Sequence, residues 1–480
     1  MTDATATLDG PPHDAAGVAA PPRPAPSSAA AQSRRGRWID DWRPEDEAFW
    51  ASTGARVAKR NLVFSILSEH IGFSVWTMWS ALVLFLGKDY GFTPAQKFLL
   101  TSTPALVGSV LRIPYTFAVA RFGGRTWTVI SGAALLVPCL AALVVLRPGV
   151  SLGTLLVVAA LAGVGGGNFA SSMANINAFY PERLKGWALG MNAGGGNLGV
   201  AAVQLVALAV LATAGSGAPR LLIGIYLPLI VVALVCAAVK MDNLTAVRNE
   251  RRAMRDAIRE PHAWVVALLY IGTFGSFIGL SFAFGQVLLT EFASRFDTPT
   301  KAASITFLGP LLGSLIRPVG GRLADRFGGA RVTLITFLAM SAGGVVIVAA
   351  SSAHSLPLYL VGFVTLFALT GVGNGSTYKM IPAIFLAKAR RSVVVDGSSA
   401  ADGQAAAALG EARRLSSGLI GVVGAIGSFG GVLVNLALRQ SFLSAQTGRS
   451  AYVAFLAYYV VCAVLTWAVY LRRSATRLIP

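Results

Sequence analysis

The sequence predicts an all-α membrane protein with twelve transmembrane helices, arranged as two parallel repeats of six helices. Three observations predict this fold class. The chain of 480 residues is 55% hydrophobic and 13% charged, about half the charged share of a soluble domain. Apolar runs about as long as a bilayer-crossing helix recur along the chain. The loop sequence RFGG occurs at the matching position of each half, at 121–124 and 326–329.

The apolar runs give the predicted helices in chain order. Each run is close to the roughly 20 residues that cross a bilayer, and the longest runs can cross at a tilt. The predicted spans cover residues 60–87, 96–120, 126–146, 151–179, 185–214, 220–240, 261–290, 299–322, 330–351, 355–386, 414–438 and 450–472.

The RFGG repeat divides the chain into two halves. Weaker repeats pair GVGGGNFASSM with GVGNGSTYKM and GMNAGGGNLGV with GVVGAIGSFGGV, so helices two, four and five each have a counterpart six helices later. The predicted domains are a disordered, basic N-terminal tail (1–59), an N-terminal six-helix half (60–240), an inter-half loop (241–260) and a C-terminal six-helix half (261–480) that contains a flexible loop at 388–413.

The net charge of +19 is distributed by topology. Basic residues gather in alternate loops, which predicts both termini on the cytoplasmic side of the cell membrane. Their expected partners are anionic lipid headgroups rather than nucleic acid. The three cysteines are scattered through apolar runs and form no metal spacing and no disulfide framework. We therefore expect no metal and no cofactor, and we expect a monomer.

One arginine lies inside the second helix of each half, at Arg112 and Arg317. Each precedes the RFGG arginine by nine residues, a helical rise of about 13 Å that places it near the bilayer midplane. A lone arginine there costs about 3 kcal/mol. It could pair with a buried carboxylate or reach the surface, but only Glu69 and Glu291 lie within the spans. Charges inside the membrane usually face a transport pathway, so we interpret the pair as an anion site.

Paired guanidinium groups favour a particular shape of anion. Guanidinium is planar, always charged and able to donate two parallel N–H bonds, so two groups suit a small, flat oxyanion. A cationic drug would need a carboxylate in the core, and a sugar would need many amide and hydroxyl groups. Phosphate or a carboxylate stays open on charge alone.

Glycine-rich segments cover helices four and five. Close packing of helices explains most of these glycines. It does not explain Asn168, Asn175, Asn192 and Asn197, whose amides need partners in an apolar environment. We expect one or two of them to donate to substrate.

Here the sequence resembles a known family. GGGNFASSMANINAFYP followed by KGWALGMNAGGGNLGV resembles the nitrate signature of the nitrate/nitrite porter (NarK-type) family of the major facilitator superfamily. The resemblance extends to FSVW (73–76), LRIPYTF (111–117), ALLYIGTFGSFIG (267–279) and GAIGSFGG (424–431), and it covers essentially all twelve spans. It implies the major facilitator fold, in which two parallel repeats hold the substrate between them. The loop GGRLADRFGGAR resembles the gating-loop motif of the superfamily, with Asp325 and Arg326 at its charged positions, whereas the first half has Ala120 in place of the aspartate.

The resemblance also implies a substrate site for nitrate and nitrite. Arg112 and Arg317 would hold the anion, with aromatic rings packed against it and amides in its plane. The other implied site residues are Phe169 beside Gly166, Asn197, Tyr270, Phe274 one turn further and Phe73. Tyr378 on helix ten is a weaker candidate outside this resemblance, because a single aromatic residue is more often part of the core.

Coupling has two alternatives. The inward-negative potential opposes anion import by about 2.3 kcal/mol per 100 mV, so either protons accompany nitrate or nitrite leaves as nitrate enters. Glu69 and His70 in helix one and Lys379 in helix ten are the proton-coupling candidates, because histidine titrates near neutral pH. Alternatively, Glu69 and Lys379 form a structural ion pair. The ionisable pair in helix one favours proton-coupled uptake over obligatory nitrate/nitrite exchange.

Other functional classes are less well supported. A porter for another small oxyanion is the nearest alternative. A membrane-embedded anion sensor is the alternative from a different class. The sequence contains no kinase, nuclease or metal-ligand constellation, so we do not expect an enzyme.

Overall fold

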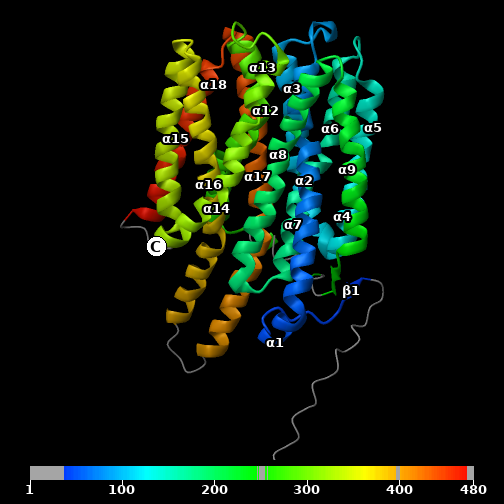
Figure 1. The fold of residues 1–480 in the computed structure, drawn as a ribbon. Coiled ribbons are helices and arrows are strands. Elements are labelled where there is room, and N and C mark those ends of the chain that lie inside the picture. The colour runs from blue at the N-terminus through cyan, green and yellow to red at the C-terminus, as the bar shows by residue number, and fades with distance from the viewer. Residues whose placement is uncertain (1–36, 246, 248–254, 257, 396–400, 473–480) are drawn as a thin grey trace, which may run out of the picture.

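The computed structural model describes residues 37–245, 247, 255, 256, 258–395 and 401–472. Long helices run side by side through one bundle (Figure 1). The first half contains β1 (Trp38–Ile39), α1 (Glu47–Phe49), η1 (Trp50–Gly54), α2 (Ala55–Phe85), η2 (Lys88–Tyr90), α3 (Pro94–Phe122), α4 (Gly124–Ala134), α5 (Leu136–Val145), α6 (Leu152–Ala162), α7 (Val164–Phe179), α8 (Glu182–Ala214) and α9 (Pro219–Lys240). The linker carries β2 (Asn243–Leu244), and the second half contains α11 (Pro261–Tyr270), η4 (Ile271–Gly275), α12 (Ser276–Glu291), α13 (Pro299–Thr306), α14 (Leu308–Phe327), α15 (Gly329–Ser352), α16 (Leu356–Val395), α17 (Ala401–Ala445), α18 (Arg449–Thr466) and η5 (Trp467–Leu471).

Twelve helical segments match the predicted spans. Eleven segments of the described chain are long and apolar enough to cross a membrane. The twelfth segment is α2, whose 31 residues include Glu69 and His70. Short breaks at Leu135, Gly163 and Phe307 divide three of the spans into consecutive helices, and the π-helical turn η4 lies within a fourth. The predicted fold class is confirmed.

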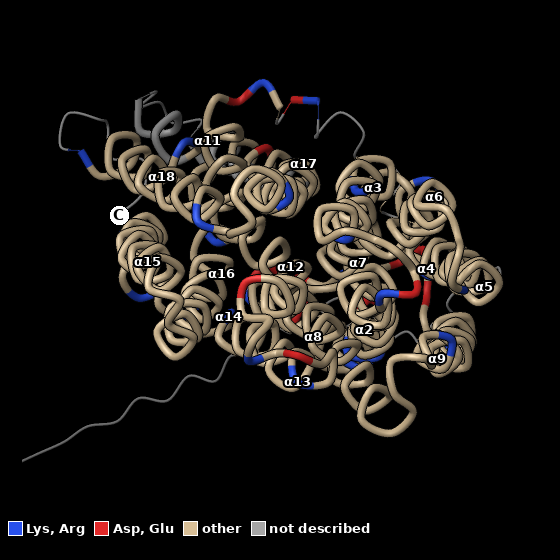
Figure 2. The backbone as a smooth tube through the Cα atoms, turned by 90° about the horizontal axis from the view of Figure 1, so that it is seen from above, with Lys and Arg blue, Asp and Glu red and all other residues tan. Residues whose placement is uncertain are grey.

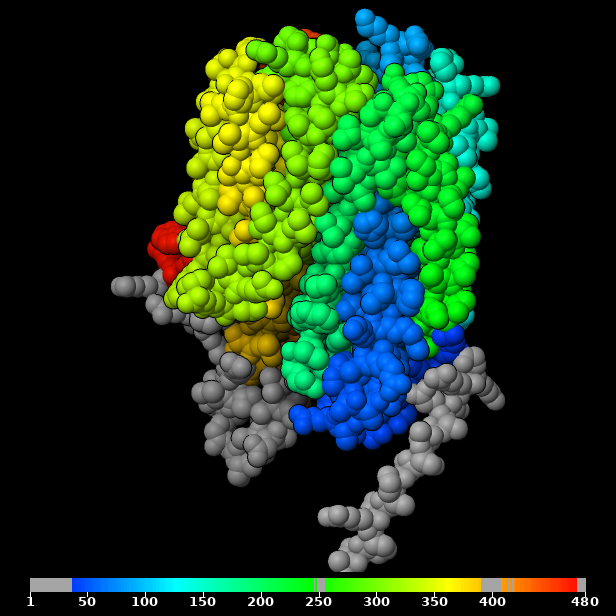
Figure 3. Space-filling model, in the orientation of Figure 1, coloured from blue at the N-terminus to red at the C-terminus, as the bar shows by residue number. Residues whose placement is uncertain are grey.

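The two halves meet along two seams. Seen from above, α3 of the first half lies beside α17 of the second, and α8 lies beside α14 (Figure 2). On the face shown in Figure 3, the beginning of α2 is exposed between α8 and α9. We call the end of the bundle that carries β1 and both RFGG loops the terminal end, and the opposite end the distal end.

The structure differs from the predicted domains at two places. Residues 1–36 of the predicted tail lie outside the described residues, but residues 37–59 are ordered against the bundle. There β1 pairs in parallel with β2. The buried carboxylate of Asp242 accepts hydrogen bonds from the side chains of Arg60 and Asn61. The predicted loop at 388–413 is largely helix, because α16 continues to Val395 and α17 begins at Ala401. Both helices project beyond the bundle at the terminal end (Figure 1).

Candidate functional site

Arg112 lies at the centre of the bundle, on α3, and its side chain is fully buried. Its Nε donates to the carbonyl of Gly166 on α7 at 3.1 Å, and its Nη1 donates to the carbonyl of Gly424 on α17 at 2.9 Å. The first carbonyl belongs to the first half and the second to the other half. Nη2 has no hydrogen-bond partner within the described part of the chain. One guanidinium group therefore bridges both halves and keeps a free donor.

Aromatic rings enclose the Arg112 guanidinium. Its Cζ lies 4.6 Å from the ring centre of Phe169, 5.1 Å from that of Phe274 and 5.4 Å from that of Trp76. Such contacts stabilise a cation through the negative faces of the rings. No carboxylate hydrogen-bonds this arginine among the described residues, so its charge is balanced by carbonyl dipoles and ring faces.

Arg317 approaches the same rings from α14. It is 5% exposed, and its Nη2 donates to the Tyr270 hydroxyl at 3.1 Å. Its Cζ lies 6.0 Å from the ring centre of Phe169, 5.9 Å from that of Phe274 and 5.7 Å from that of Tyr378. Nη1 is unpaired within the described residues. Two guanidinium groups from opposite halves thus share one pair of rings, and each retains an unpaired N–H donor.

A π-helical turn shapes the aromatic wall. The rings of Tyr270, at the end of α11, and Phe274, in η4, stack at 5.1 Å and 8°, and Phe274 stacks on Phe169 of the other half at 6.0 Å. Phe73 completes the wall, at 6.1 Å from Phe169. Single π-helical turns inside α-helices frequently occur at functional sites. The structure therefore brings together all the aromatic residues that the sequence assigned to the site.

Gly166 is required by close packing. A Cβ atom at this position would lie 2.6 Å from the Trp76 ring and 2.9 Å from the Cα of Gly108. The absence of a side chain lets α7 approach α3, and this approach brings the Gly166 carbonyl to Arg112.

The four asparagines have different environments. The amide of Asn192 donates a hydrogen bond to Glu69 at 2.6 Å, so its partner is a residue of the first half. Asn197 is fully buried, and neither its amide nitrogen nor its oxygen has a partner among the described residues. Asn168 has an unpaired oxygen and Asn175 an unpaired nitrogen. The structure places Asn197 without a hydrogen bond to either arginine.

Glu69 is the buried carboxylate of the first half, at 1% exposure. The hydroxyl of Ser172 and the amide of Asn192 both donate to one of its oxygens, and the other oxygen is unpaired within the described residues. His70 points toward α8, where its Nδ1 lies 3.2 Å from the carbonyl of Gly195. His70 is thus partly buried and lies at hydrogen-bond distance from a backbone carbonyl of the first half.

Lys379 lies away from Glu69, so the predicted structural pair between them is wrong. Its Nζ donates to Asp325 at 2.8 Å, at the terminal end, and the lysine side chain is 34% exposed. The same nitrogen borders α8 of the first half, since a Cβ atom on Gly186 would lie 3.1 Å from it. Arg326 lies over the ring of Phe327. Lys379 thus joins the predicted gating loop rather than the helix-one pair.

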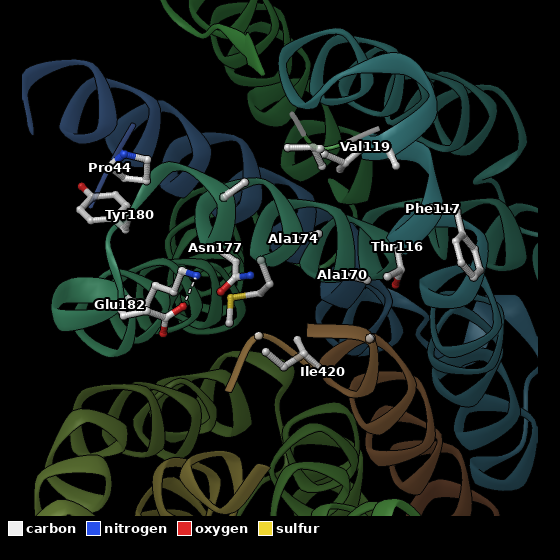
Figure 4. A pocket seen from close by; sticks show the side chains of 18 of the residues that line it. Pro44, Thr116, Phe117, Val119, Ala170, Ala174, Asn177, Tyr180, Glu182 and Ile420 are labelled. Atoms are coloured by element: carbon white, nitrogen blue, oxygen red, sulfur yellow. Dashed lines mark hydrogen bonds and ion pairs between the residues drawn. The ribbon is translucent and has the colours of Figure 1, made fainter. Parts of the chain in front are cut away.

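A cavity of about 320 Å³ leads inward from the terminal end (Figure 4). Its outer wall holds the Glu182–Lys185 ion pair, at 2.7 Å, and the figure shows Asn177 facing the same space. Its inner wall includes Thr116, one turn beyond Arg112, and Ala170, next to Phe169. We call this cavity the vestibule, because it connects the terminal end with the neighbourhood of the two arginines.

Sequence reasoning missed two parts of the site. Trp76 stacks with Arg112, and the carbonyl of Gly424 accepts its hydrogen bond. Both positions lie within quoted motifs, FSVW and GAIGSFGG. The tryptophan could have been found by its spacing of three residues from Phe73, about one helical turn. A backbone carbonyl leaves no such signal.

Comparisons with known proteins identify the family of the chain. The family model described as Major Facilitator Superfamily matches residues 71–410. The chain is 37% identical over 457 residues to the nitrate/nitrite transporter NarU of Escherichia coli (strain K12), covering 91% of this chain and 96% of that protein. It is 31% identical over 470 residues to the probable nitrate/nitrite antiporter NarK2 of Thermus thermophilus, covering 93% and 99%.

Solved structures agree at the level of fold. The crystal structure of a D-xylose-proton symporter gives a TM-score of 0.65 at 12% identity, covering 88% of this chain and 99% of that chain. The fold and the sequence matches together show that this chain belongs to the major facilitator superfamily, a superfamily of transporters rather than enzymes, and within it to the NarK-type family of nitrate/nitrite porters.

Proposed function

We propose that this protein transports nitrate and nitrite across the cytoplasmic membrane by alternating access, and that it takes up nitrate together with protons. One observation carries the anion site. Arg112 and Arg317 come from opposite halves, share the rings of Phe169 and Phe274, and each keep an unpaired guanidinium nitrogen. A flat oxyanion between the rings would accept both donors in its own plane. Asn197 and Tyr378 are the further candidates for polar contact with it.

Contacts between the halves support alternating access. At the distal end the halves are joined by a hydrogen bond from Thr101 to Asn435 at 2.9 Å and one from Gln204 to the carbonyl of Ser281 at 3.0 Å. At the terminal end the vestibule separates α3 and α7 from α17. A bound anion would reduce the repulsion between the two arginines and favour closure of the vestibule.

Charge movement favours proton coupling. The membrane potential opposes entry of an anion, and one accompanying proton would cancel its charge. Glu69 is the group best placed to carry that proton, because it is buried and no cation hydrogen-bonds it among the described residues. We assign His70 a role in supporting Glu69, and we assign Lys379 to the gating loop, where it pairs with Asp325. Obligatory nitrate/nitrite exchange is the second candidate, supported by the similarity to the probable nitrate/nitrite antiporter of Thermus thermophilus.

Topology completes the proposal. We place the terminal end in the cytoplasm, because the loops there carry the basic residues of the positive-inside pattern. Anionic lipids would contact these loops, and the protein would work as a monomer, with one substrate path between its own halves.

Proteoliposomes with an imposed inward proton gradient and no internal nitrite test the coupling. We expect uptake of labelled nitrate against its gradient, and this result would exclude obligatory exchange. Uptake that occurs only after nitrite is loaded inside would instead exclude a proton role for Glu69 and His70. Failure to move either anion under both conditions would support the sensor alternative.

A further inference from the structure

A second, smaller cavity lies inside the first half, bordered by Glu69. Its volume is about 10 Å³, about the space that one water molecule needs. It is lined by Ser65, Ser68, Glu69, Thr128, Ser131, Asn168, Ser171 and Ser172. Every lining residue is polar, and α2, α4 and α7 each contribute at least two of them.

Three lining residues carry polar atoms that are buried and have no hydrogen-bond partner in the described chain. These atoms are Ser68 Oγ, Asn168 Oδ1 and Glu69 Oε1. Leaving such atoms unpaired costs about 1–3 kcal/mol each. A buried water typically makes about three hydrogen bonds, so this cavity has both the size and the partners that one water molecule requires.

The polar lining continues toward the terminal end. Thr128 and Ser131 are three residues apart on α4, and Asn175 follows Ser171 and Ser172 on α7 by about one turn. Asn175 packs directly on Gly124, where a Cβ atom would lie 1.8 Å from the amide oxygen. Gly124 belongs to the RFGG loop and accepts a hydrogen bond from Thr128 through its carbonyl. We call the polar residues from Glu69 through Thr128 and Asn175 to this loop the seam.

This seam is separate from the vestibule. The vestibule is lined by Ala170, Met173, Ala174, Asn177 and Ala178 of α7. The seam uses residues 168, 171, 172 and 175 of the same helix. At 3.6 residues per turn, residues 170, 173, 174 and 177 face away from the seam residues, and Ala178 lies at the edge between the two faces. One helix therefore divides a polar route inside the first half from the path between the halves.

The charged and titratable groups around Glu69 are few. On α2 the neighbour is His70, held at the carbonyl of Gly195. Arg112 on α3, Arg317 on α14 and Tyr378 on α16 interact with Glu69 electrostatically across the site. The groups of α7 and α8 that hydrogen-bond it, Ser172 and Asn192, are neutral. The lining residues that the seam brings to Glu69 carry hydroxyl and amide groups and no charge.

We propose that the small cavity holds a water molecule that exchanges protons with Glu69, and that the seam carries the proton to the terminal end while nitrate leaves through the vestibule. Protonated Glu69 gives its proton to the water, and the resulting hydronium ion gives a proton to the Thr128 hydroxyl, which releases its own proton to solvent water at the terminal end. Asn175 contributes hydrogen bonds to this route and takes no proton. No bond other than O–H bonds changes, and nothing is oxidised. The inference rests on the proposed proton coupling and adds its route.

Two variants at one position test the route. Thr128→Val removes the hydroxyl with almost no change of volume, and Thr128→Ser keeps the hydroxyl. In proteoliposomes we expect Thr128→Val to slow nitrate-dependent proton uptake about tenfold relative to Thr128→Ser, the scale of losing one water-mediated contact. Counterflow of labelled nitrate against internal nitrate needs no proton release and should be equal in the two variants. Thr333→Val, at the matching position of the second half, is the control and should retain the native ratio of protons to nitrate.

The outcomes separate the two proposals. Equal proton uptake in Thr128→Val and Thr128→Ser, whether fast or slow, would overturn the route, since only the hydroxyl distinguishes them. Loss of counterflow in Thr128→Val alone would also overturn it, because the hydroxyl would then serve the anion path. Absence of nitrate-dependent proton uptake in the unaltered protein, with counterflow present, would overturn the coupling itself.

Discussion

The two halves share a repeat but use one position differently. Glu69 in the first half and Tyr270 in the second each precede a site phenylalanine by four residues, Phe73 and Phe274. Tyr270 accepts a hydrogen bond from Arg317 of its own half. Glu69 instead accepts hydrogen bonds from Ser172 and Asn192, and no arginine of the described residues hydrogen-bonds it. The second half therefore uses this position to orient a guanidinium, and the first half uses it to hold a carboxylate beside the site.

A second pair of positions shows the same contrast. Aligned on RFGG, Thr128 of the first half matches Thr333 of the second. The hydroxyl of Thr333 pairs directly with that of Ser376 at 2.9 Å. Thr128 bonds to the Gly124 carbonyl of its own helix and borders the small polar cavity. The Thr333 hydroxyl is thus paired with a side chain across to α16, whereas the Thr128 hydroxyl borders a space with room for water, which suits a division of labour between anion orientation and proton transfer.

The largest expected effect concerns the two arginines that the repeat relates. Arg112 donates hydrogen bonds to two backbone carbonyls, whereas Arg317 donates one to a hydroxyl. Arg112→Lys keeps the charge and loses the fork that bridges Gly166 and Gly424. We expect kcat/KM for nitrate uptake to fall about 100-fold or more, the scale of disrupting a buried, hydrogen-bonded charge. Arg317→Lys loses one hydrogen bond to a neutral hydroxyl, so its kcat/KM for nitrate uptake should fall about tenfold. Initial rates of labelled nitrate uptake in proteoliposomes measure both.

A matched control is Arg121→Lys in the first RFGG loop, where the side chain is exposed and transport should be unchanged. Undiminished transport by Arg112→Lys would contradict the anion clamp. Equal losses in the two core variants would remove the asymmetry between the halves while leaving the clamp in place.

The next effect separates coupling from binding. Glu69→Gln keeps the acceptor of Ser172 but cannot release a proton, so uptake driven by a proton gradient should fall to background while nitrate counterflow stays within about twofold. Tyr270→Phe removes the acceptor of Arg317, so the KM for nitrate should rise about fivefold to tenfold. Its ratio of protons to nitrate should stay native. Parallel recordings of internal pH and labelled nitrate give both quantities.

The contrast between Glu69 and Tyr270 would be contradicted if Glu69→Gln showed the effect expected of Tyr270→Phe, or the reverse. A change of KM in Glu69→Gln without loss of the proton flux would place this carboxylate in anion binding. An altered proton ratio in Tyr270→Phe would place a part of the proton path in the second half.

The fold was predictable where hydropathy reports it. The predicted second span, 96–120, lies within α3, Pro94–Phe122, because its ends coincide with the change from apolar to polar residues. The extensions of α16 and α17 beyond the bundle carry no such signal. The segment AAAALGEA at 405–412 is rich in alanine, the strongest helix former, but it is too short an apolar run to indicate a membrane helix, so hydropathy predicts a loop where the helix continues.

The site was predictable only as far as side chains mark it. The repeat locates Arg112 and Arg317, and their rings follow from the family resemblance. The carbonyl of Gly424 contributes through the backbone, which no residue type encodes. Lys379 was grouped with Glu69 because its depth within α16 depends on where that helix leaves the bundle. Only the contact with Asp325 places it at the terminal end.

The smallest expected effect concerns that contact, which the first half lacks because Ala120 stands at the position of Asp325. The Lys379–Asp325 pair is partly exposed, and such pairs contribute about 0–1 kcal/mol. Lys379→Ala and Asp325→Ala should therefore each change the rate of nitrate uptake by no more than about fivefold. Because the pair lies beside Gly186 of the first half, its loss should alter the rate of gating and leave the KM for counterflow unchanged. The double variant Asp325→Lys with Lys379→Asp reverses the two charges, and it should restore the rate of nitrate uptake if the ion pair itself sets the rate of gating. A swap that stays as slow as the single variants would show instead that the loop needs the aspartate for itself, and the second half would then differ from the first in loop structure rather than in a contact across the gate.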